Sequence, residues 1–352
     1  MSADREVIDI RPEERLDVER LEPFLRAHLP GAQGPLGIRQ FGGGHANLTY
    51  LVRFGSREFV LRRPPLGPIA PSAHDMQREH RVLSVLHRAY ALAPRSLLLC
   101  TDPAIIGADF VIEERRFGSV IRSELPAILA SDARRAERLG YAVIDALADL
   151  HQVDAEAVGL GDFGRPPGYL DRQVDGWIGR WHAAKDRELP AAGPVIAWID
   201  KERPPSRAVA IVHNDYKLDN LLLDAGDPTR IEAVLDWDMC TRGDPLMDLG
   251  YLLNFWAQAS DDAAWIEAAP SPTLHPGFPT RREIIERYAA RTGFALDAIT
   301  WHAVFGVFRL IVIIQQIFIR YLRGQTHDER FAVFGKRVEL LYAKSQALIA
   351  GG

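Results

Sequence analysis

One stretch of the chain, residues 211–223, restricts the fold and the chemistry more than any other. Two short apolar runs enclose a polar loop with the sequence His-Asn-Asp-Tyr-Lys-Leu-Asp-Asn. In this loop Asp215 is followed by Lys217 and, five residues on, by Asn220, and a later apolar run ends in Asp236. Phosphoryl transfer needs this combination: a carboxylate that accepts a hydroxyl proton, and an amide and a carboxylate that hold Mg²⁺ against nucleotide phosphates.

The same loop has a plainer interpretation, because turns rich in Asp and Asn commonly join two strands. Its Asp-x-x-x-x-Asn spacing, however, matches the catalytic loop of protein kinases. Asp236 stands where a metal ligand is expected, at the end of the strand that follows. The segment Gly-Asp-Pro-Leu-Met-Asp-Leu at 243–249 stands where a further loop and the start of a helix are expected. Together these elements favour a phosphoryl-transfer site over a simple turn.

The apolar periodicity changes along the chain from strand-like to helix-like. Strands that precede helices in this way predict an α+β, two-lobed architecture with the nucleotide in the cleft between the lobes. The expected elements are a short amphipathic helix at 21–29, a β-hairpin within 38–63, a helix at about 73–90, strands at 96–101 and 109–114, helices at 131–151 and 171–185, and further helices after residue 249.

Composition sets wider bounds. With 352 residues, of which 47% are apolar and 25% charged, the chain is long enough for two lobes with their own cores. A net charge of −5 gives no basic surface for nucleic acid. Cys100 and Cys240 have no metal-ligand spacing and are typical of buried thiols in a reducing compartment. The first twenty residues lack the apolar core of a secretory signal, so we expect a cytoplasmic protein.

The apolar stretch 304–322 is the one candidate for a membrane span in the sequence. It contains Arg309, Arg320 and two glutamines, and charges at that depth are costly in lipid. We therefore expect a buried helix of the helical lobe and no membrane span. The sequence gives no indication of an oligomeric state.

The motifs resemble the aminoglycoside phosphotransferase family of small-molecule kinases, which has a protein-kinase-like fold. Within that family, Phe-Gly-Gly-Gly-His-Ala-Asn-Leu-Thr-Tyr at 41–50 and Val-Leu-Arg-Arg-Pro-Pro at 60–65 are most similar to kinase-like domains fused to, or encoded beside, certain acyl-CoA dehydrogenases. The resemblance runs from about residue 20 to about residue 340. It implies an N-lobe at 1–114 with a five-stranded antiparallel sheet and a helix, a hinge at 115–118, and a mostly helical C-lobe at 119–352.

Carried over residue by residue, the resemblance implies a role for each polar residue of the central motif. Asp215 would be the catalytic base, and Lys217 would neutralise charge on the transferring γ-phosphoryl group. Asn220 and Asp236 would ligate Mg²⁺. The nucleotide, ATP or GTP, and a small hydroxyl-bearing molecule would be the two substrates.

Two neighbours of the motif are expected to support it, and three positions depart from kinase patterns. Asp248 would be a buried carboxylate that accepts hydrogen bonds from the catalytic loop, and His213 would support the loop through hydrogen bonds. Asn214 stands where the family usually has glycine, and Ala46 where it commonly has serine. Arg62 stands where the general kinase pattern has lysine, although arginine is usual in the group linked to acyl-CoA dehydrogenases. Arginine keeps the charge but differs from lysine in reach and shape.

The expected nucleotide site comes from the first third of the chain. A glycine triplet at 42–44 lies between the first two strands, where backbone amides can approach phosphate. Glu79 is the expected partner of Arg62, with a solvated face residue as its alternative because residues 78–81 are all polar. By resemblance, the backbone near the hinge would bind adenine. The expected nucleotide-binding residues are Gly43, Gly44, Asn47, Arg62, Glu79, Glu113, Glu114 and Arg115.

The identity of the acceptor stays open between three hypotheses. The expected acceptor region holds more aromatic than acidic side chains, which favours a partly apolar substrate such as a hydroxyacyl-CoA. An aminoglycoside is polycationic and requires an acidic groove. A non-catalytic nucleotide-binding protein with the same fold is the third reading, and the full set of catalytic residues weighs against it. The side chains concerned, which could equally belong to the core, are Tyr251, Phe255, Trp256, Trp265, Asp261, Asp262 and Glu267.

Overall fold

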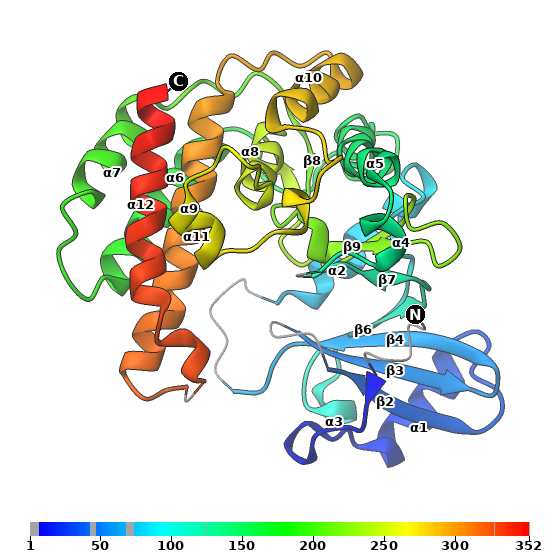
Figure 1. The fold of residues 1–352 in the computed structure, drawn as a ribbon. Helices are drawn as coiled ribbons and strands as arrows, with labels where there is room; N and C mark the ends of the chain where they lie inside the picture. The colour runs from blue at the N-terminus through cyan, green and yellow to red at the C-terminus, as the bar shows by residue number, and fades with distance from the viewer. Residues whose placement is uncertain (1–6, 43–46, 68–73, 123, 327, 352) are drawn as a thin grey trace. The chain divides into compact units, whose positions relative to one another are not determined.

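The computed structural model describes residues 7–42, 47–67, 74–122, 124–326 and 328–351 (Figure 1). Contacts divide the chain into two compact units, each made of three segments. Unit 1 comprises Met1–Ile121, Val153–Gly161 and Asp219–Cys240, and unit 2 comprises Arg122–Gln152, Asp162–Leu218 and Thr241–Gly352. Asp215 therefore belongs to unit 2, whereas Asn220 and Asp236 belong to unit 1.

Unit 1 is built on a six-stranded antiparallel sheet in the order β1-β2-β3-β4-β6-β5. The five strands expected from the sequence are all present, and the expected strand number is corrected by one, because the two-residue strand β1 adds to the edge of β2. Two residues are too few to show the alternation that identifies a strand. The strands are β1 (Val7–Ile8), β2 (Leu36–Phe41), β3 (Leu48–Phe54), β4 (Arg57–Arg63), β5 (Ser96–Cys100) and β6 (Phe110–Glu114).

The β3–β4 hairpin shows why this part of the sequence forms a sheet. Tyr50, Val52 and Phe54 alternate along β3, are almost fully buried, and pack with residues of α1 such as Leu21 in one core. Alternate residues of a strand share one face, so this spacing gives the sheet its buried side. Gly55 makes the turn with a positive φ of 57°, which glycine adopts without steric cost.

A second sheet of unit 1 has three strands in the order β10-β9-β7. Its central hairpin, β9 (Leu221–Leu223) and β10 (Ile231–Val234), follows the short helix η4 (Leu218–Asn220), and β7 (Ser119–Val120) pairs with β9. The expected helix at 73–90 is shorter than predicted and is followed by a separate 3₁₀ turn. The helices of unit 1 are η2 (Pro12–Glu14), α1 (Val18–His28), α2 (Met76–Leu83), η3 (Leu86–Arg88) and α3 (Pro103–Ile106).

Unit 2 is mostly helical and contains one two-stranded antiparallel sheet, β8 (Ala210–Val212) with β11 (Thr241–Gly243). The expected helix at 131–151 begins after Asp132, whose side chain accepts a hydrogen bond from the backbone of Arg134. The helices are α4 (Ala127–Ala130), α5 (Ala133–His151), α6 (Tyr169–Ala184), α7 (Ala192–Lys201), α8 (Leu246–Phe255), α9 (Ala263–Ala268), η5 (Pro272–Leu274), α10 (Arg281–Thr292), α11 (Ile299–Leu322), η6 (Glu329–Phe331) and α12 (Phe334–Gly351).

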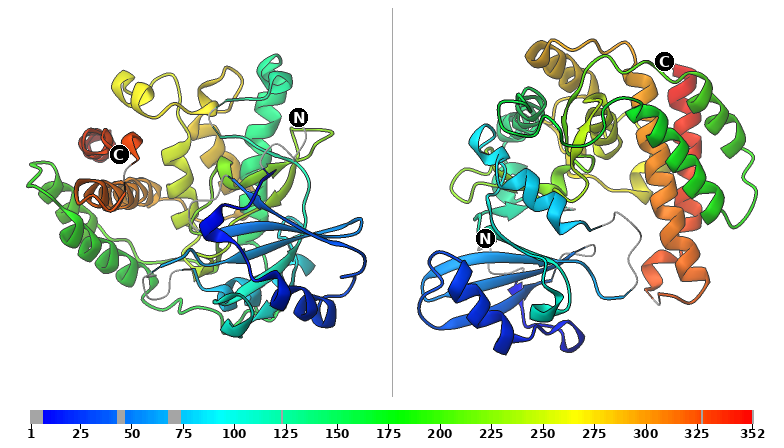
Figure 2. Two further views of the ribbon diagram at one scale, coloured as in Figure 1. Left: turned by 90° about the horizontal axis from the view of Figure 1, so that it is seen from below. Right: turned by 180° about the vertical axis from the view of Figure 1, so that it is seen from behind.

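Helix α11 organises the core of unit 2. It packs against α6, α8 and α12, and Figure 2 shows it running beside α12. By length and composition α11 could cross a membrane, but 67% of its most apolar window is buried inside the structure. This burial supports the expectation of a core helix. Trp177 and Trp181 of α6 lie in the same core.

Helices α8 and α11 approach each other closely through two glycines. A Cβ atom added at Gly250 would lie 2.5 Å from the backbone of His302, and one added at Gly306 would lie 2.8 Å from the carbonyl oxygen of Gly250. Any larger residue at either position therefore forces the helices apart. This contact fixes α8, which carries Asp248 near one end and Asn254 near the other.

Candidate functional site

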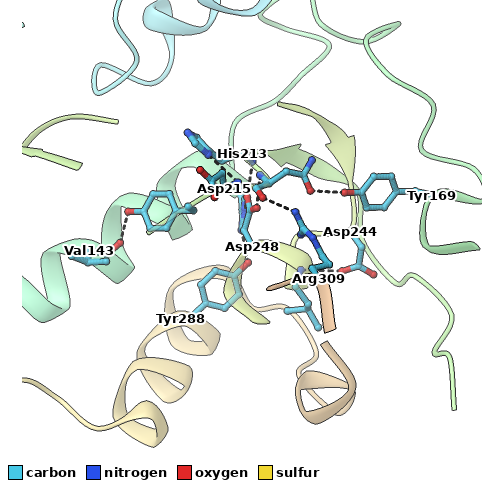
Figure 3. Close-up of polar contacts among 12 residues, drawn as sticks. Val143, Tyr169, His213, Asp215, Asp244, Asp248, Tyr288 and Arg309 are labelled. Carbon is cyan, nitrogen blue, oxygen red and sulfur yellow. Dashed lines mark hydrogen bonds and ion pairs between the residues drawn. The ribbon is translucent and has the colours of Figure 1, made fainter. Parts of the chain in front are cut away.

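The catalytic loop leaves β8 and is held by one buried carboxylate of α8. Asp248 accepts a hydrogen bond at 2.6 Å from the backbone of His213 and another at 2.6 Å from the backbone of Asn214 (Figure 3). Its Oδ2 atom also lies 3.1 Å from Nε2 of His151, whose Nδ1 contacts the hydroxyl of Tyr288 at 2.6 Å. These contacts confirm the expected structural role of Asp248.

The charge of Asp248 is stabilised despite full burial. Burial by itself raises the pKa of a carboxyl group, because it disfavours the charged form. Here the hydrogen bond and charge of His151, together with His213, outweigh burial and lower the pKa of Asp248. The anchor of the loop is therefore an ionised carboxylate with well-matched partners.

The backbone conformation of Asn214 is one that glycine, the usual residue of the family at this position, also adopts. Its φ is +66°, a left-handed conformation that glycine adopts freely and that asparagine tolerates better than most residues. The side chain gains a contact that glycine cannot make, because the hydroxyl of Tyr169 donates to Oδ1 at 2.8 Å. Arg309 donates to the backbone oxygen of Asn214 at 2.8 Å (Figure 3). The substitution thus keeps the loop conformation and adds an anchor.

The two proposed catalytic side chains lie together and are partly exposed. Nζ of Lys217 is 3.1 Å from Oδ2 of Asp215, and both side chains keep about a fifth of their surface exposed (21% and 23%). The backbone of Asp215 donates to Nδ1 of His213 at 3.3 Å, which agrees with the expected supporting role of His213. Lys217 also lies over the ring of Phe255, 5.7 Å from its centroid.

Tyr251 is a further contact of Asp215. Burial raises the pKa of Tyr251, and the charge of Asp215, with which its hydroxyl is hydrogen-bonded, raises it further. The hydroxyl therefore stays protonated and can donate to the carboxylate. The sequence suggested Tyr251 only as part of an aromatic acceptor region, because nothing in its spacing reveals that α8 turns it toward the loop.

The other expected acceptor-region residues differ in burial, and Asp262 and Glu267 are exposed. Trp256 and Trp265 are buried, and Trp256 donates to the backbone oxygen of Pro279. Asp261 is paired with Arg281. Phe255 keeps partial exposure beside Lys217. The core explanation left open by the sequence thus holds for the two tryptophans.

In unit 1, Asp236 follows β10 and meets the expected phosphate-binding arginine. Nη2 of Arg62 is 2.7 Å from Oδ1 of Asp236, and Nε of Arg62 is 2.9 Å from Oε1 of Glu79. The expected Arg62–Glu79 ion pair is therefore confirmed, and Glu79 is 1% exposed rather than a solvated face residue. The register of β4 against β6 explains the burial of Arg62, which pairs with Val111 in the middle of the sheet.

Glu113 completes an acidic cluster around Arg62. Its side chain is buried, and burial is the main cause that raises its pKa to about 7. Burial also raises the pKa of Glu79, with Arg62 opposing and Glu113 reinforcing the shift. From the sequence, Glu113 was expected only to border adenine. A side chain that reaches from β6 toward Arg62 depends on strand register, which sequence does not reveal.

Asn220 and Asp236, the expected metal ligands, come from adjoining backbone segments. The backbone of Leu235 donates to the carbonyl oxygen of Asn220 at 2.8 Å, so the residue before Asp236 is tied to Asn220. Their side chains offer amide and carboxylate oxygens, a donor set that suits Mg²⁺, which commonly uses one or two carboxylates, waters and substrate phosphates. Among the described residues no group of three or more His, Cys, Asp and Glu could hold a metal by itself.

Asn47 links the residues after the glycine segment to the end of β10. Its Oδ1 is 2.8 Å from Nδ1 of His74, and its Nδ2 donates to Oδ2 of Asp238 at 3.5 Å. The sequence missed His74 and Asp238, although the second carboxylate of Asp-Trp-Asp was visible. Gly43, Gly44 and Ala46 lie outside the described residues.

The side chains of the expected hinge residues make contacts within unit 1. Glu114 accepts from the backbone of Arg95 at 3.0 Å and from Arg116 at 2.7 Å. The guanidinium of Arg115 lies over the rings of Phe41 and Phe117, 4.8 and 5.4 Å from their centroids. Binding of a base by the backbone at these positions stays a prediction from the resemblance.

The chain is similar to known proteins over most of its length. The profile described as the phosphotransferase enzyme family matches residues 37–284. Acyl-CoA dehydrogenase family member 11 of Rattus norvegicus is 31% identical over 339 residues, which are 94% of this chain and 43% of that protein, so the chain spans less than half of that relative.

Solved structures extend the likeness to the fold. A candidate aminoglycoside phosphotransferase of Ralstonia eutropha has a TM-score of 0.79 and 30% identity, with 95% of this chain and 98% of that chain covered. A thermostable mutant of an aminoglycoside phosphotransferase, in a ternary complex with ADP and hygromycin B, has a TM-score of 0.59 and 16% identity, with 94% and 98% covered. The α+β, protein-kinase-like fold expected from the sequence is confirmed.

Proposed function

Because this chain belongs to the phosphotransferase enzyme family, we propose that it transfers the γ-phosphoryl group of ATP or GTP to a hydroxyl group of a small molecule. The observation that carries the proposal is the catalytic loop anchored by Asp248. Its backbone is fixed, whereas the side chains of Asp215 and Lys217 are partly exposed. Catalysis by positioning requires such a combination of a rigid loop and accessible reactive groups.

In the proposed reaction the oxygen of the acceptor hydroxyl attacks the γ-phosphorus, and Asp215 accepts the proton of that hydroxyl. The nucleoside diphosphate is the leaving group. Tyr251 hydrogen-bonds to the carboxylate of Asp215 and so holds it in one orientation. Lys217, 3.1 Å from Asp215, neutralises negative charge on the transferring group. Such electrostatic stabilisation supplies most of the catalysis in phosphoryl transfer.

Asn220 and Asp236 are the proposed ligands of Mg²⁺, which neutralises charge on the nucleotide phosphates when bound. Arg62 is proposed to contact the same phosphates, with Glu79 fixing the direction of its guanidinium. Asn47, Gly43 and Gly44 would border the phosphates, and backbone groups of 113–115 would border the base. The structure that supports these roles is the ion-paired cluster around Arg62 in unit 1.

For the acceptor we propose a hydroxyacyl-CoA. Support comes from the relative named for acyl-CoA chemistry, of which this chain matches one part. An aminoglycoside is the second candidate, since a structure of the same fold contains hygromycin B. A polycation requires unpaired carboxylates in its site. Of the three acidic residues of the region, Asp261 is paired with Arg281 and the side chain of Asp262 accepts hydrogen bonds from the start of α9, which favours the acyl-CoA candidate.

The test is ADP or GDP release by the purified full chain with a panel of hydroxyacyl-CoAs and aminoglycosides, in Mg²⁺ and in EDTA. We expect turnover with a hydroxyacyl-CoA that stops in EDTA. Turnover that persists in EDTA contradicts the assigned roles of Asn220 and Asp236. Mg²⁺-dependent nucleotide binding without turnover on any hydroxyl compound indicates a non-catalytic nucleotide-binding protein instead.

A further inference from the structure

A cavity in unit 2 lies beside the carboxyl end of α8. Its volume is about 250 Å³, slightly below the range of roughly 300–1,000 Å³ typical of small-molecule sites. Its walls come from α8, α10, α11 and α12, and much of the lining is aliphatic, including Leu253, Ile285, Ile299 and Leu348. This lining suits a short apolar group.

One side chain of the lining, Lys344 of α12, is a cation in an unfavourable environment. Its Nζ donates to the carbonyl oxygen of Asn254 at 3.3 Å and lies 4.6 Å from the ring centroid of Trp265. Burial, reinforced by the charge of Arg281 and opposed by that of Asp261, lowers the pKa of Lys344 to about 8. An ammonium group has three donors, and the one hydrogen bond to Asn254 uses one of them.

The nearby carboxylate is already engaged. Asp261, ahead of α9, is paired through both oxygens with Arg281 of α10, and its Oδ2 also accepts from the backbone of Gln258 at 3.0 Å. Arg281 and Asp261 are the charged groups that act on Lys344, and the lining residues from α8 and α11 are uncharged. Protonated Lys344 therefore leaves this site with one positive charge in excess.

We propose that this cavity binds a small alkyl monocarboxylate, with the carboxylate against Lys344 and the alkyl group against the aliphatic wall. A single negative charge balances the site, and a charge-assisted hydrogen bond to the ammonium uses its remaining donors. Burial of the alkyl group contributes the hydrophobic part of the affinity, about 0.8 kcal/mol for each CH₂ group. The proposal is independent of phosphoryl transfer, because it concerns binding without nucleotide.

The first test is calorimetric titration of the full chain, without nucleotide, with octanoate, 1-octanol and octyl phosphate. We expect octanoate to bind more tightly than either analogue, because 1-octanol lacks the charge and octyl phosphate adds a second one. Affinity for octanoate should stay constant below the pKa of Lys344 and fall by up to about tenfold per pH unit above it, since binding requires the protonated amine. Tighter binding of octyl phosphate, an affinity independent of pH, or no heat with octanoate overturns the proposal.

Variants test the role of Lys344 and that of the cavity wall separately. Lys344→Met keeps a long apolar side chain and should lose octanoate binding at least tenfold, together with the pH dependence. Lys336→Met is the matched control, since Lys336 lies exposed on the same helix and should bind octanoate like the native chain. Ala347→Leu narrows the mouth of the cavity at an exposed position and should weaken binding while Lys344 is intact. Native affinity in Lys344→Met, or in Ala347→Leu if Lys344→Met does not fold, contradicts the assignment.

Discussion

Two buried carboxylates, Asp248 in unit 2 and Glu79 in unit 1, have opposite electrostatic situations. Both are 1% exposed or less. Asp248 accepts two backbone hydrogen bonds and contacts His151, and its pKa is lowered. Glu79 has Arg62 on one side and Glu113 close by, and its pKa is raised. Glu113 also makes a side-chain hydrogen bond with Glu79, which requires that one of the two carboxyl groups carries a proton.

From this difference we infer that the two carboxyl groups have different roles. The carboxylate of Asp248 is fully used to fix a backbone conformation, so its contribution is stability. Glu79 is paired with Arg62, and we propose that it directs the guanidinium and so contributes to nucleotide binding more than to stability. Buried groups with shifted pKa values tend to gather at functional sites. The predictions below test this division.

The largest effect is expected at the anchor of the loop. Asp248→Ala leaves two backbone N–H groups and His151 without their acceptor, which should lower the free energy of unfolding by about 3–5 kcal/mol. Urea denaturation followed by circular dichroism measures this. Glu79→Gln is the matched comparison and should change the free energy of unfolding by less than about 1 kcal/mol. Equal losses in the two variants contradict the division between stability and function.

The next effect is on the chemical step alone. Asp215→Asn should lower kcat by about 10²-fold or more, the scale of losing general-base catalysis, while the melting temperature and nucleotide affinity stay unchanged. Steady-state kinetics and nucleotide titration of the same preparation provide both quantities. An undiminished kcat places the base on another residue.

A third prediction concerns coupling between Arg62 and Glu79. Because Glu79 directs the guanidinium, the losses in kcat/KM for ATP caused by Arg62→Ala and Glu79→Ala should be non-additive by about 0.5–3 kcal/mol. The double-mutant cycle measures this, with Arg62→Lys showing how far charge without the planar fork suffices. Strict additivity reduces Glu79 to a stabilising residue, which would bring it into the same class as Asp248.

The last effect is a pH dependence of stability. A carboxyl whose pKa is raised on folding binds protons more tightly in the folded state, so the stability it contributes is lost as pH rises from its unfolded pKa through its folded pKa. For Glu113, with a folded pKa of about 7, this loss should occur between about pH 5 and 8 and amount to about 2–3 kcal/mol. Glu113→Gln should remove the part of this loss that Glu113 contributes. Asp248, with a lowered pKa, instead loses its contribution only in strong acid.

Urea midpoints of the native chain and Glu113→Gln across this range provide the measurement. A native profile as flat as that of Glu113→Gln means that Glu113 stays ionised in the folded protein. The negative charge of Glu113 would then be balanced in the folded protein as fully as that of Asp248.

Local pattern predicted the elements and the central loop, while long-range partners escaped it. The β3–β4 hairpin and α5 were predicted because their spacing alone gives a buried face, and Asp248 because its segment resembles a known motif. His151 as a partner of Asp248, and His74 as a partner of Asn47, are separated from them by 97 and 27 residues. Such pairs arise only when strands and helices have packed, so no short window of sequence contains them.

Strand register and helix rotation explain the remaining contacts that the sequence did not predict. Glu113 lies in a strand that the sequence placed correctly, but its direction toward Arg62 depends on how β6 pairs with β4. A shift of one residue would turn Glu113 to the other face of the sheet. The same reasoning applies to Tyr251, whose contact with Asp215 depends on the rotation of α8.

The contact of Gly250 with α11 has a consequence for inheritance as well as for structure. The two glycines seat one helix that carries the loop anchor Asp248 near one end and the cavity wall residue Asn254 near the other. A single codon change from glycine to alanine at position 250 would displace that helix as a body. The proposed phosphoryl transfer and the proposed carboxylate binding would then decline together in one allele, so genetic data alone would count them as one trait.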